Sequence, residues 1–393
     1  MTSGTTVLSK SRSVIQYLHD PSLVAYFQEL CGIRRYSANG MSKNGTNGKS
    51  YENGKNKKQK EKDFVITNKS LDVLFQIGSA LGNELFLTFF FSWFFWSVDS
   101  FVGRRVCMFW AVYMYIGQAT KDFLKYPRPA SPPVIRLEKR YELEYGFPST
   151  HAMTGVGLPV AAFIFTYTRY DYYAYIGIII CSLWGLLVGL SRLYLGMHSI
   201  LDILAGYVYI FLITPIFLPI LDILDPYILD YPYTPIVIPS ILILIMAFYP
   251  KCKEWNSARG DTALVLGIAG GIMIGHWFAR EWNLMTRTGY EHQSLKHEIT
   301  MPSLKVCSIV FIRQVVGLII LVITRFTFKY GSIYGLCKIF GFDWRNVEHR
   351  KFGLIEIPYK LITYNAMAIN AVILAPSVFE LLNIDRSDFR GEL

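Results

Sequence analysis

Apolar runs follow one another along most of the chain, separated by polar breaks. The first begins near Leu71 and the last ends near residue 382. Each approaches the ~20 residues that a helix needs to cross about 30 Å of hydrocarbon. No segment alternates with the period of a membrane β-barrel. We therefore expect an all-α, polytopic transmembrane bundle of about eight to nine spans, at 78–98, 105–123, 152–168, 173–192, 199–220, 235–249 (the shortest), 262–279, 306–328 and 360–382.

The first 63 residues do not share this pattern. The stretch 37–62 is rich in Gly, Asn, Lys and Ser, a composition that cannot bury a core. We expect a polar, largely disordered tail over 1–63, in which 12–33 favours a short helix. The stretch Leu71–Leu81 is expected to form an amphipathic piece on the surface before the first span.

Composition agrees with a membrane protein. Hydrophobic residues make up 52% of the chain and charged residues 17%, which is too little charge to cover a soluble protein of this length. The net charge of +10 lies in the tail and in short segments between apolar runs, where it sets topology or meets anionic groups. We therefore expect membrane lipids, and no nucleic acid, among the partners. The six scattered cysteines have no zinc-ligand spacing.

Two of the polar breaks carry candidate chemistry. The break 121–150 is long, Pro-rich and basic, and has Arg128-Pro129 seven residues after Lys121. It leads into Pro148-Ser149-Thr150-His151. The second break follows the fourth predicted span and contains Ser191-Arg192, His198 and Asp202.

The spacing of His198 and Asp202 suits a nucleophilic histidine. Residues four apart share one face of a helix and can touch. An Asp on one ring nitrogen fixes the tautomer and supports positive charge, which leaves the other nitrogen free to attack. Arg192 precedes this pair across a helix start, whose free N–H groups favour an anion.

The three cations indicate what that anion is. Lys121, Arg128 and Arg192 lie beside predicted spans, where unpaired charge is costly. A phosphate supplies the partner, because guanidinium groups match its oxygens bidentately and Lys adds a point charge. We expect His198 to attack phosphorus and form a phosphohistidine. His151 would protonate the leaving alkoxide and then activate water.

Ser149, Thr150 and the amides around them complete the predicted phosphate site. No acidic cluster suited to Mg²⁺ or Zn²⁺ accompanies these residues, so we expect neither a metal nor another cofactor. Each motif alone has a simpler interpretation: a basic flank beside the membrane, a helix cap, or a structural network at a helix end. All three in this order, each at a span boundary, favour an enzyme.

These motifs resemble those of the phosphatidic acid phosphatase type 2 superfamily: Lys-x6-Arg-Pro, Pro-Ser-Gly-His and Ser-Arg-x5-His-x3-Asp. The resemblance implies a six-helix-like catalytic core and a metal-independent phosphatase. The phosphate-binding residues that it implies are Lys121, Arg128, Ser149, Thr150 and Arg192. The catalytic residues that it implies are His198 as nucleophile, His151 as acid and Asp202 as the partner of His198. Thr150 stands where most members have Gly, which costs backbone freedom but keeps the amide available.

The wider stretches 126–138 and 145–155 resemble one branch, the sphingosine-1-phosphate phosphatases. That branch has Thr at the third position of the second motif and has extra C-terminal spans. The resemblance implies hydrolysis of sphingosine-1-phosphate or a related sphingoid-base phosphate in the endoplasmic reticulum membrane. We accordingly expect a catalytic core over 64–221 and an accessory bundle over 222–393.

Two other functions remain open at this point. One is a broad-specificity lipid phosphate phosphatase acting on phosphatidic or lysophosphatidic acid. The other is an inactive lipid-binding or transport protein with a vestigial pocket.

The membrane side of the site is also open. The branch implies a lumenal active site, yet only two predicted spans precede Lys121, and a cytosolic basic tail would then place the site in the cytosol. The tail and its border carry glycosylation sequons at Asn44 and Asn68.

Other polar residues in the apolar part of the chain have simpler interpretations. His276 is expected to be a satisfied packing histidine. Arg313 would face the bundle or a lipid headgroup, with Glu281 or Glu356 as a possible partner. The acidic loop residues after the fifth predicted span are expected to form a solvated turn: Asp222, Asp225 and Asp230.

Overall fold

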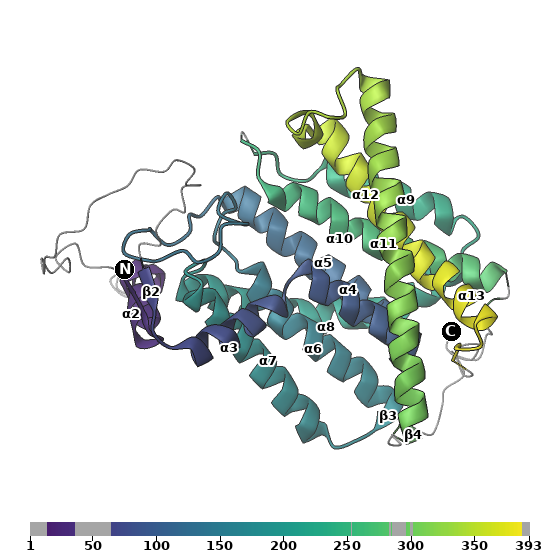
Figure 1. Cartoon of the computed structure of the whole chain (residues 1–393), viewed down its shortest axis with the longest axis horizontal. Coiled ribbons are helices and arrows are strands. Elements are labelled where there is room, and N and C mark those ends of the chain that lie inside the picture. The colour runs from purple at the N-terminus through teal and green to yellow at the C-terminus, as the bar shows by residue number, and fades with distance from the viewer. Residues whose placement is uncertain are drawn as a thin grey trace, which may run out of the picture.

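The computed structural model describes residues 14–35, 64–252, 254–282, 284, 296–298 and 302–386. Helices dominate it (Figure 1), as predicted. The elements along the N-terminal half are α2 (Pro21–Leu30), β1 (Ile33–Arg35), β2 (Phe64–Ile66), α3 (Lys69–Ala80), α4 (Glu84–Trp93), η1 (Phe94–Val98), α5 (Ser100–Leu124), α6 (Thr150–Arg169), β3 (Tyr170–Asp171) and α7 (Ala174–Tyr194). Those that follow are α8 (Ile200–Asp230), α9 (Thr234–Ala247), α10 (Ser257–Glu281), β4 (His297–Glu298), α11 (Leu304–Phe340), η2 (His349–Lys351), α12 (Gly353–Val372) and α13 (Leu374–Leu381).

Two pairs of very short strands accompany the helices. Strands β1 and β2 are antiparallel, with Ile33 opposite Ile66. Strands β3 and β4 are parallel and pair Tyr170 with His297. The second pair ties the end of α6 to the segment before α11.

The number of membrane spans differs from the sequence prediction. Five described helices (α7, α8, α10, α11 and α12 with α13) are long and apolar enough to cross a membrane. The bent pair of α3 and α4–η1, with 62° between its parts, would make a sixth. The predicted span 235–249 corresponds to α9, which has only 14 residues. The predicted total of eight to nine is therefore not confirmed.

Polar side chains cap the helices that lead away from the two motif-bearing loops. Ser149 accepts a hydrogen bond from the Ala152 amide, at 3.3 Å, and begins α6. Ser199 and Asp202 form a reciprocal capping box that begins α8. Side-chain caps satisfy amides that a helix start leaves without partners, so they fix where each helix begins.

Helix α10 lies at the centre of the C-terminal half. Of the five long apolar helices it is the most enclosed by the described protein. Gly267, Gly271 and Gly275 recur every four residues along it and face the backbone of α12 near Leu361, Asn365 and Ile369. A Cβ on Gly267 would lie 3.0 Å from the Leu361 carbonyl oxygen. Small residues at this spacing let two membrane helices approach closely.

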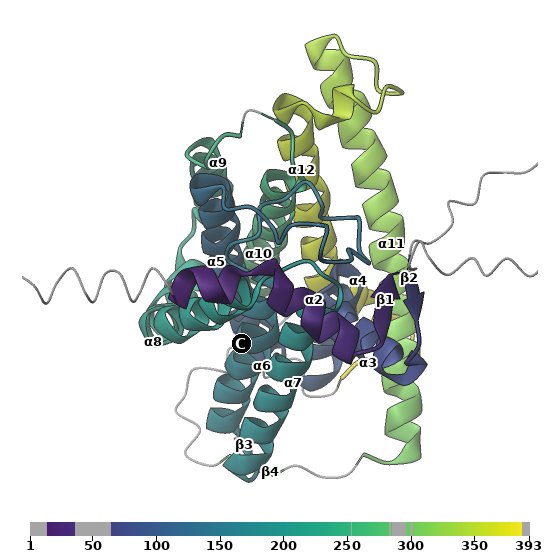
Figure 2. The same cartoon turned by 90° about the vertical axis from the view of Figure 1, so that its left-hand side faces the viewer.

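The N-terminal segment is packed on one end of the bundle. The chain is helical over 14–19 and again in α2, in agreement with the short helix expected over 12–33. Gln28 is buried, and its amide nitrogen donates to the carbonyl oxygens of Ile135 and Tyr194. Figure 2, in which this end faces the viewer, shows α2 running across the ends of the bundle helices. The expectations for 1–13 and 36–63 lie outside the described residues.

The expected solvated turn at 222–230 is wrong. Helix α8 continues to Asp230, and Asp225 is buried with Arg104 Nε 2.7 Å from Asp225 Oδ1. Arg105 contacts both Asp222 and Asp225. The basic partners of Asp222 and Asp225 lie over 100 positions earlier, at the start of α5, whereas Asp230 pairs with Arg280 at the end of α10.

Two other buried polar residues have structural roles. His276 Nε2 lies 3.1 Å from Ser100 Oγ, and its Nδ1 lies 2.8 Å from the Ile272 carbonyl oxygen. This agrees with a satisfied packing histidine. Arg313 donates to the carbonyl oxygens of Trp96 and Ile384, so backbone groups take the place of the acidic partners considered from the sequence.

Candidate active site

The residues of the three motifs converge at one end of the bundle. Lys121 lies in the last turn of α5, His151 in the first turn of α6, and Arg192 in the last turn of α7. Arg128 lies in the loop after α5, and His198 just before α8. All five line one cavity. The structure thus brings together groups that lie up to 77 positions apart in the chain, from Lys121 to His198.

The three predicted phosphate-binding cations are almost completely buried. Lys121 is 2% exposed, Arg128 8% and Arg192 1%. Lys121 Nζ lies 3.1 Å from Glu144 Oε2 and 2.9 Å from Thr150 Oγ1. Buried charge needs such partners.

The two guanidinium groups are held differently. Arg128 donates to the carbonyl oxygens of Glu144 at 2.8 Å and Met197 at 2.7 Å. Arg192 Nη1 lies 3.4 Å from Glu138 Oε2, a long contact to a partly exposed carboxylate. Arg192 Nη2 is buried and has no hydrogen-bond partner among the described residues. Arg192 therefore keeps donor capacity for an anion.

Glu144 joins the catalytic loop to the C-terminal half of the chain. One carboxylate oxygen faces Lys121 and the other accepts a hydrogen bond from Ser257, the first residue of α10. Burial alone would raise the pKa of Glu144, but Lys121, the Ser257 hydrogen bond and Arg128 outweigh it and lower that pKa below its ordinary value. Glu144 is therefore ionised at neutral pH and neutralises part of the cationic cluster.

Charged groups lie beside both ring nitrogens of His198. Nε2 lies 3.2 Å from Arg128 Nη1. Nδ1 lies 3.7 Å from Asp202 Oδ2, which is longer than a hydrogen bond, and has no hydrogen-bond partner among the described residues. Because a guanidinium only donates hydrogen bonds, Nε2 must accept. The proton of the neutral ring is then on Nδ1, toward the carboxylate. The Nε2 lone pair points into the cation cluster.

Burial lowers the pKa of His198 well below its usual value, and the charges of Arg128 and Lys121 lower it further. The imidazole is therefore neutral at neutral pH, which is the form that can attack an electrophile. The Asp202 carboxylate is held in turn by the Ser199 amide, 2.7 Å from Oδ2.

His151 lines the same cavity. Its ring contacts Tyr141 edge-on, with centroids 5.4 Å apart. Its Nε2 is buried without a hydrogen-bond partner among the described residues. Gly82, between α3 and α4, packs on the ring: a Cβ there would lie 2.7 Å from His151 Cδ2. An imidazole nitrogen left free in a cationic cavity is available for proton transfer to a bound molecule.

The two polar residues of the second motif have different positions. Thr150 directs its hydroxyl oxygen to Lys121, as described above. Ser149 is fully buried, with its hydroxyl at the cap of α6 and its amide donating to the Asp202 carbonyl oxygen at 3.0 Å. Ser149 therefore links the second and third motifs.

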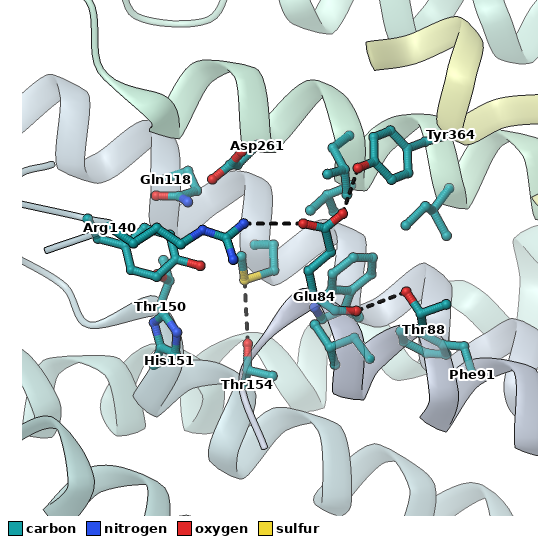
Figure 3. Close-up of a pocket in the computed structure, with 18 of the residues that line it drawn as sticks. Glu84, Thr88, Phe91, Gln118, Arg140, Thr150, His151, Thr154, Asp261 and Tyr364 are labelled. Carbon is teal, nitrogen blue, oxygen red and sulfur yellow. Dashed lines mark hydrogen bonds and ion pairs between the residues drawn. The ribbon is translucent and has the colours of Figure 1, made fainter. Parts of the chain in front are cut away.

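The cavity continues from this polar end into the apolar interior. Figure 3 shows Glu84, Arg140, Asp261 and Tyr364 around its upper part. Further from the phosphate end it is lined by apolar residues of α4, α5, α10, α11 and α12, among them Phe91, Trp110, Leu264, Ile268 and Ala368. Charged groups at one end and hydrocarbon at the other suit an amphiphile with an anionic head.

Sequence reasoning missed several parts of this site. Glu144 was not singled out, because a lone Glu in a loop carries no spacing signal. Ser257, Asp261 and Tyr364 belong to helices that were assigned to the accessory bundle. A signal was available for two of them: Ser257 and Asp261 lie near the start of α10, an otherwise apolar helix. A charged residue within a membrane helix is a candidate for function.

Comparison with known proteins identifies the family of the chain. The PAP2 superfamily model matches residues 102–222. The chain is 37% identical to rat (Rattus norvegicus) sphingosine-1-phosphate phosphatase 1, over 81% of this chain and 74% of that protein. It is 32% identical to human (Homo sapiens) sphingosine-1-phosphate phosphatase 2, over 94% of this chain and 99% of that protein.

A more distant similarity covers about half of the chain. Lipid phosphate phosphatase delta of Arabidopsis thaliana is 27% identical over 53% of this chain and 52% of its own length. No solved structure matches the chain. Because the similarity to the animal proteins extends well beyond the PAP2 region, the chain belongs to the sphingosine-1-phosphate phosphatase family of the PAP2 superfamily.

Proposed function

We propose that this lipid phosphate phosphatase hydrolyses a sphingoid-base 1-phosphate, such as sphingosine-1-phosphate, to the free base and inorganic phosphate. The names of its relatives support this substrate class. The observation that carries the proposal is the position of His198, whose Nε2 faces Arg128 while its Nδ1 faces Asp202. This pair lies at the polar end of a cavity that continues into the apolar core.

In the first step, His198 Nε2 attacks phosphorus. Without substrate, burial and the charge of Arg192 lower the pKa of His151, so its ring takes up a proton when the anionic phosphate enters. The bond between phosphorus and the lipid oxygen then breaks, and His151 gives its Nε2 proton to the leaving alkoxide. Lys121, Arg128 and Arg192 neutralise the equatorial phosphate oxygens as charge develops. The positive phosphohistidine ring is stabilised by Asp202 on its other nitrogen.

In the second step, water attacks the phosphohistidine. His151, now neutral, takes a proton from that water, and the bond between phosphorus and His198 breaks. Inorganic phosphate leaves, and His198 returns to the neutral form that its surroundings favour. Thr150 and Ser149 act by position: Thr150 holds Lys121, and Ser149 couples α6 to the Asp202 backbone.

We assign the catalytic core to 64–221 and the accessory bundle to 222–393. The accessory helices are proposed to hold the lipid, since α10, α11 and α12 line the apolar part of the cavity. No partner other than lipid substrate and membrane lipids is invoked.

The test is phosphate release by the purified full-length protein from a panel of lipid phosphates. We expect turnover of sphingosine-1-phosphate to exceed that of lysophosphatidic and phosphatidic acid at least about tenfold, because a site built to bond a polar group disfavours analogues that lack it. Equal turnover on all three would favour the broad-specificity alternative. Binding without any phosphate release would favour the inactive lipid-binding alternative.

Removal of divalent metal should leave this turnover unchanged. In the proposed mechanism the three basic side chains supply the charge that a metal would otherwise provide. We expect rates with and without excess EDTA to agree within about twofold. Complete loss with EDTA, restored by one divalent ion, would contradict a mechanism carried by these side chains alone.

We further propose that the protein resides in the endoplasmic reticulum membrane with this site facing the lumen. The N-terminal segment and the site lie on the same side of the membrane, because both are at one end of the bundle. His19 lies 3.2 Å from Ser199 Oγ, and Arg35 donates to the Val134 carbonyl oxygen, so 14–35 lie at the catalytic end. A lumenal site would therefore require a lumenal N-terminus despite its basic residues.

An epitope at the N-terminus would test this orientation. In sealed microsomes we expect the epitope to be protected from added protease and to be digested once detergent opens the membrane. Digestion in sealed microsomes would place the N-terminus, and with it the catalytic end, in the cytosol. An epitope on a resident lumenal protein reports whether the vesicles are intact.

A further inference from the structure

We propose that Asp261 and Gln118 bind the ammonium group of the sphingoid-base phosphate and thereby set the preference for lipids that carry an amine. The proposal rests on the proposed function, because it assumes that a phosphate lipid enters this cavity. It assigns a specificity-determining role to one residue of the core helix α5 and one residue of α10.

The two residues lie one helical turn deeper than the phosphate end. Gln118 precedes Lys121 by three positions on α5, and Asp261 follows Ser257 by four positions on α10. Lys121 and Ser257 are joined through the Glu144 carboxylate. One helical turn spans about 5.4 Å. In a sphingoid-base phosphate the amine is on the carbon next to the one that bears the phosphate ester, so an offset of this size suits it.

Gln118 has unused hydrogen-bonding capacity. Its side chain is 4% exposed, it lines the cavity, and its Oε1 has no hydrogen-bond partner among the described residues. Figure 3 shows Gln118 and Asp261 along the same part of the cavity wall. A buried amide oxygen without a partner is costly unless a ligand supplies the donor.

Asp261 is the least compensated of the carboxylates that line this cavity in the described part of the chain. Glu84 is held by Arg140, Arg325 and the Tyr364 hydroxyl. Glu144 is held by Lys121 and Ser257. Asp261 has a single ion pair, 3.3 Å from its Oδ1 to Lys360 Nζ.

That single cation is also shared. Lys360 Nζ lies 3.0 Å from Glu356 Oε1, so two carboxylates face one ammonium group. The Trp255 indole N–H donates to the other Glu356 oxygen. Arg140 also lines the cavity near Asp261, but its ion pair is with Glu84. Asp261 therefore has carboxylate capacity that a substrate ammonium can use.

The cavity beyond Asp261 and Gln118 is largely apolar, which explains why the amine is bound at these two residues. Along α10, Asp261 is followed by Leu264, Val265, Ile268 and Ile272 on the same wall, and along α5 Gln118 is preceded by Met114 and Trp110. The sixteen residues of helix from Ser257 to Ile272 span about 22 Å. From Ser257 toward Ile272, the cavity wall thus carries first the phosphate ligands, then the ammonium ligands, and then apolar residues that line a channel for one long hydrocarbon chain.

Two substrates that differ only in the amine test this assignment. One is sphingosine-1-phosphate, and the other is the same chain with hydrogen in place of the amine. For the purified full-length protein, Asp261→Asn should lower kcat/KM for the amine-bearing substrate about tenfold to a hundredfold, because the substrate ammonium loses its ionic partner in the cavity. The amine-free substrate should change by less than about threefold. Gln118→Leu should shift the ratio of kcat/KM values the same way, to a smaller extent.

Glu281→Gln is the matched control. Glu281 is an exposed carboxylate at the other end of α10, so its loss should leave the ratio unchanged. Asp261→Glu keeps the charge and should restore most of the preference. If Asp261→Asn loses both activities, Gln118→Leu decides, because it removes a side chain whose oxygen has no bond to lose.

An unchanged ratio in both Asp261→Asn and Gln118→Leu would overturn the assignment while leaving the proposed function intact. Failure of the unsubstituted protein to release phosphate from either lipid would overturn the proposed function itself. The two outcomes are therefore distinguishable.

Discussion

His198→Ala should abolish phosphate release and leave no phosphorylated enzyme. The substitution removes the only atom proposed to bond phosphorus, so the cations can still bind the substrate but cannot transfer its phosphoryl group. Removal of a nucleophile that acts within a catalytic unit typically costs about 10⁵-fold or more in turnover. Substrate binding should be retained, since Lys121, Arg128 and Arg192 keep their partners.

The measurement is single turnover with ³²P-labelled lipid, followed by alkaline quench and separation of the protein. The unsubstituted protein should show a transient protein-bound label that is stable to alkali and labile to acid, as expected for a phosphohistidine. His297→Ala is the matched control, because this exposed histidine lies in β4, at the end of α6 away from the site. A label that persists in His198→Ala would contradict the proposed nucleophile.

The motif spacing allowed the core of the site to be predicted. His198 and Asp202 are four positions apart, which indicated an imidazole beside a carboxylate. The expected shared helix face is wrong, because His198 lies before the Ser199 cap of α8, and the loop rather than the helix brings it to Asp202. Lys121, Arg128 and Arg192 could be grouped because each charge flanks an apolar run. The structure places all five in or beside one cavity. Short-range spacing and charge at span boundaries are signals that a single sequence carries.

Long-range pairing was not predictable in the same way. Asp225 looked like a loop carboxylate, and its partner Arg104 lies 121 positions earlier. Glu144 pairs with Lys121 only because the Pro-rich loop folds back over the end of α5. Such contacts depend on how the helices are arranged, which periodicity does not encode.

The limits of the catalytic region were also hidden from the sequence. The division at residue 221 follows the motifs, yet α8 runs through it to Asp230 without a break. Helix α10 contributes Ser257 and Asp261 to the cavity wall, and the glycines along it allow α12 to approach. The C-terminal helices therefore shape the substrate cavity, which a core-plus-accessory description understates.

The second large effect is expected for Asp202→Asn, with a loss of about 10³-fold to 10⁴-fold in turnover. The carboxylate lies 3.7 Å from His198 Nδ1, and its charge favours the tautomer with the proton on that nitrogen. An amide has no charge to stabilise the positive phosphohistidine, and its N–H₂ group can favour the other tautomer, in which Nε2 is protonated and cannot attack. The same exchange beside a catalytic histidine costs about 10⁴-fold in serine proteases.

A structural role must be separated from this electrostatic one, because Asp202 also accepts the Ser199 amide in the capping box of α8. Ser199→Ala removes the other half of that box, the 3.2 Å bond from the Asp202 amide to the Ser199 hydroxyl, together with the contact of that hydroxyl with His19, and leaves the carboxylate in place. It should lower stability by about 1 kcal/mol, seen as a lower Tm, with turnover nearly unchanged. Asp202→Asn should show the reverse: a similar Tm and a slow formation of the phosphoenzyme in single turnover. If both variants lose stability and activity in parallel, Asp202 acts mainly as a helix cap, and His198 must be oriented by Arg128 alone.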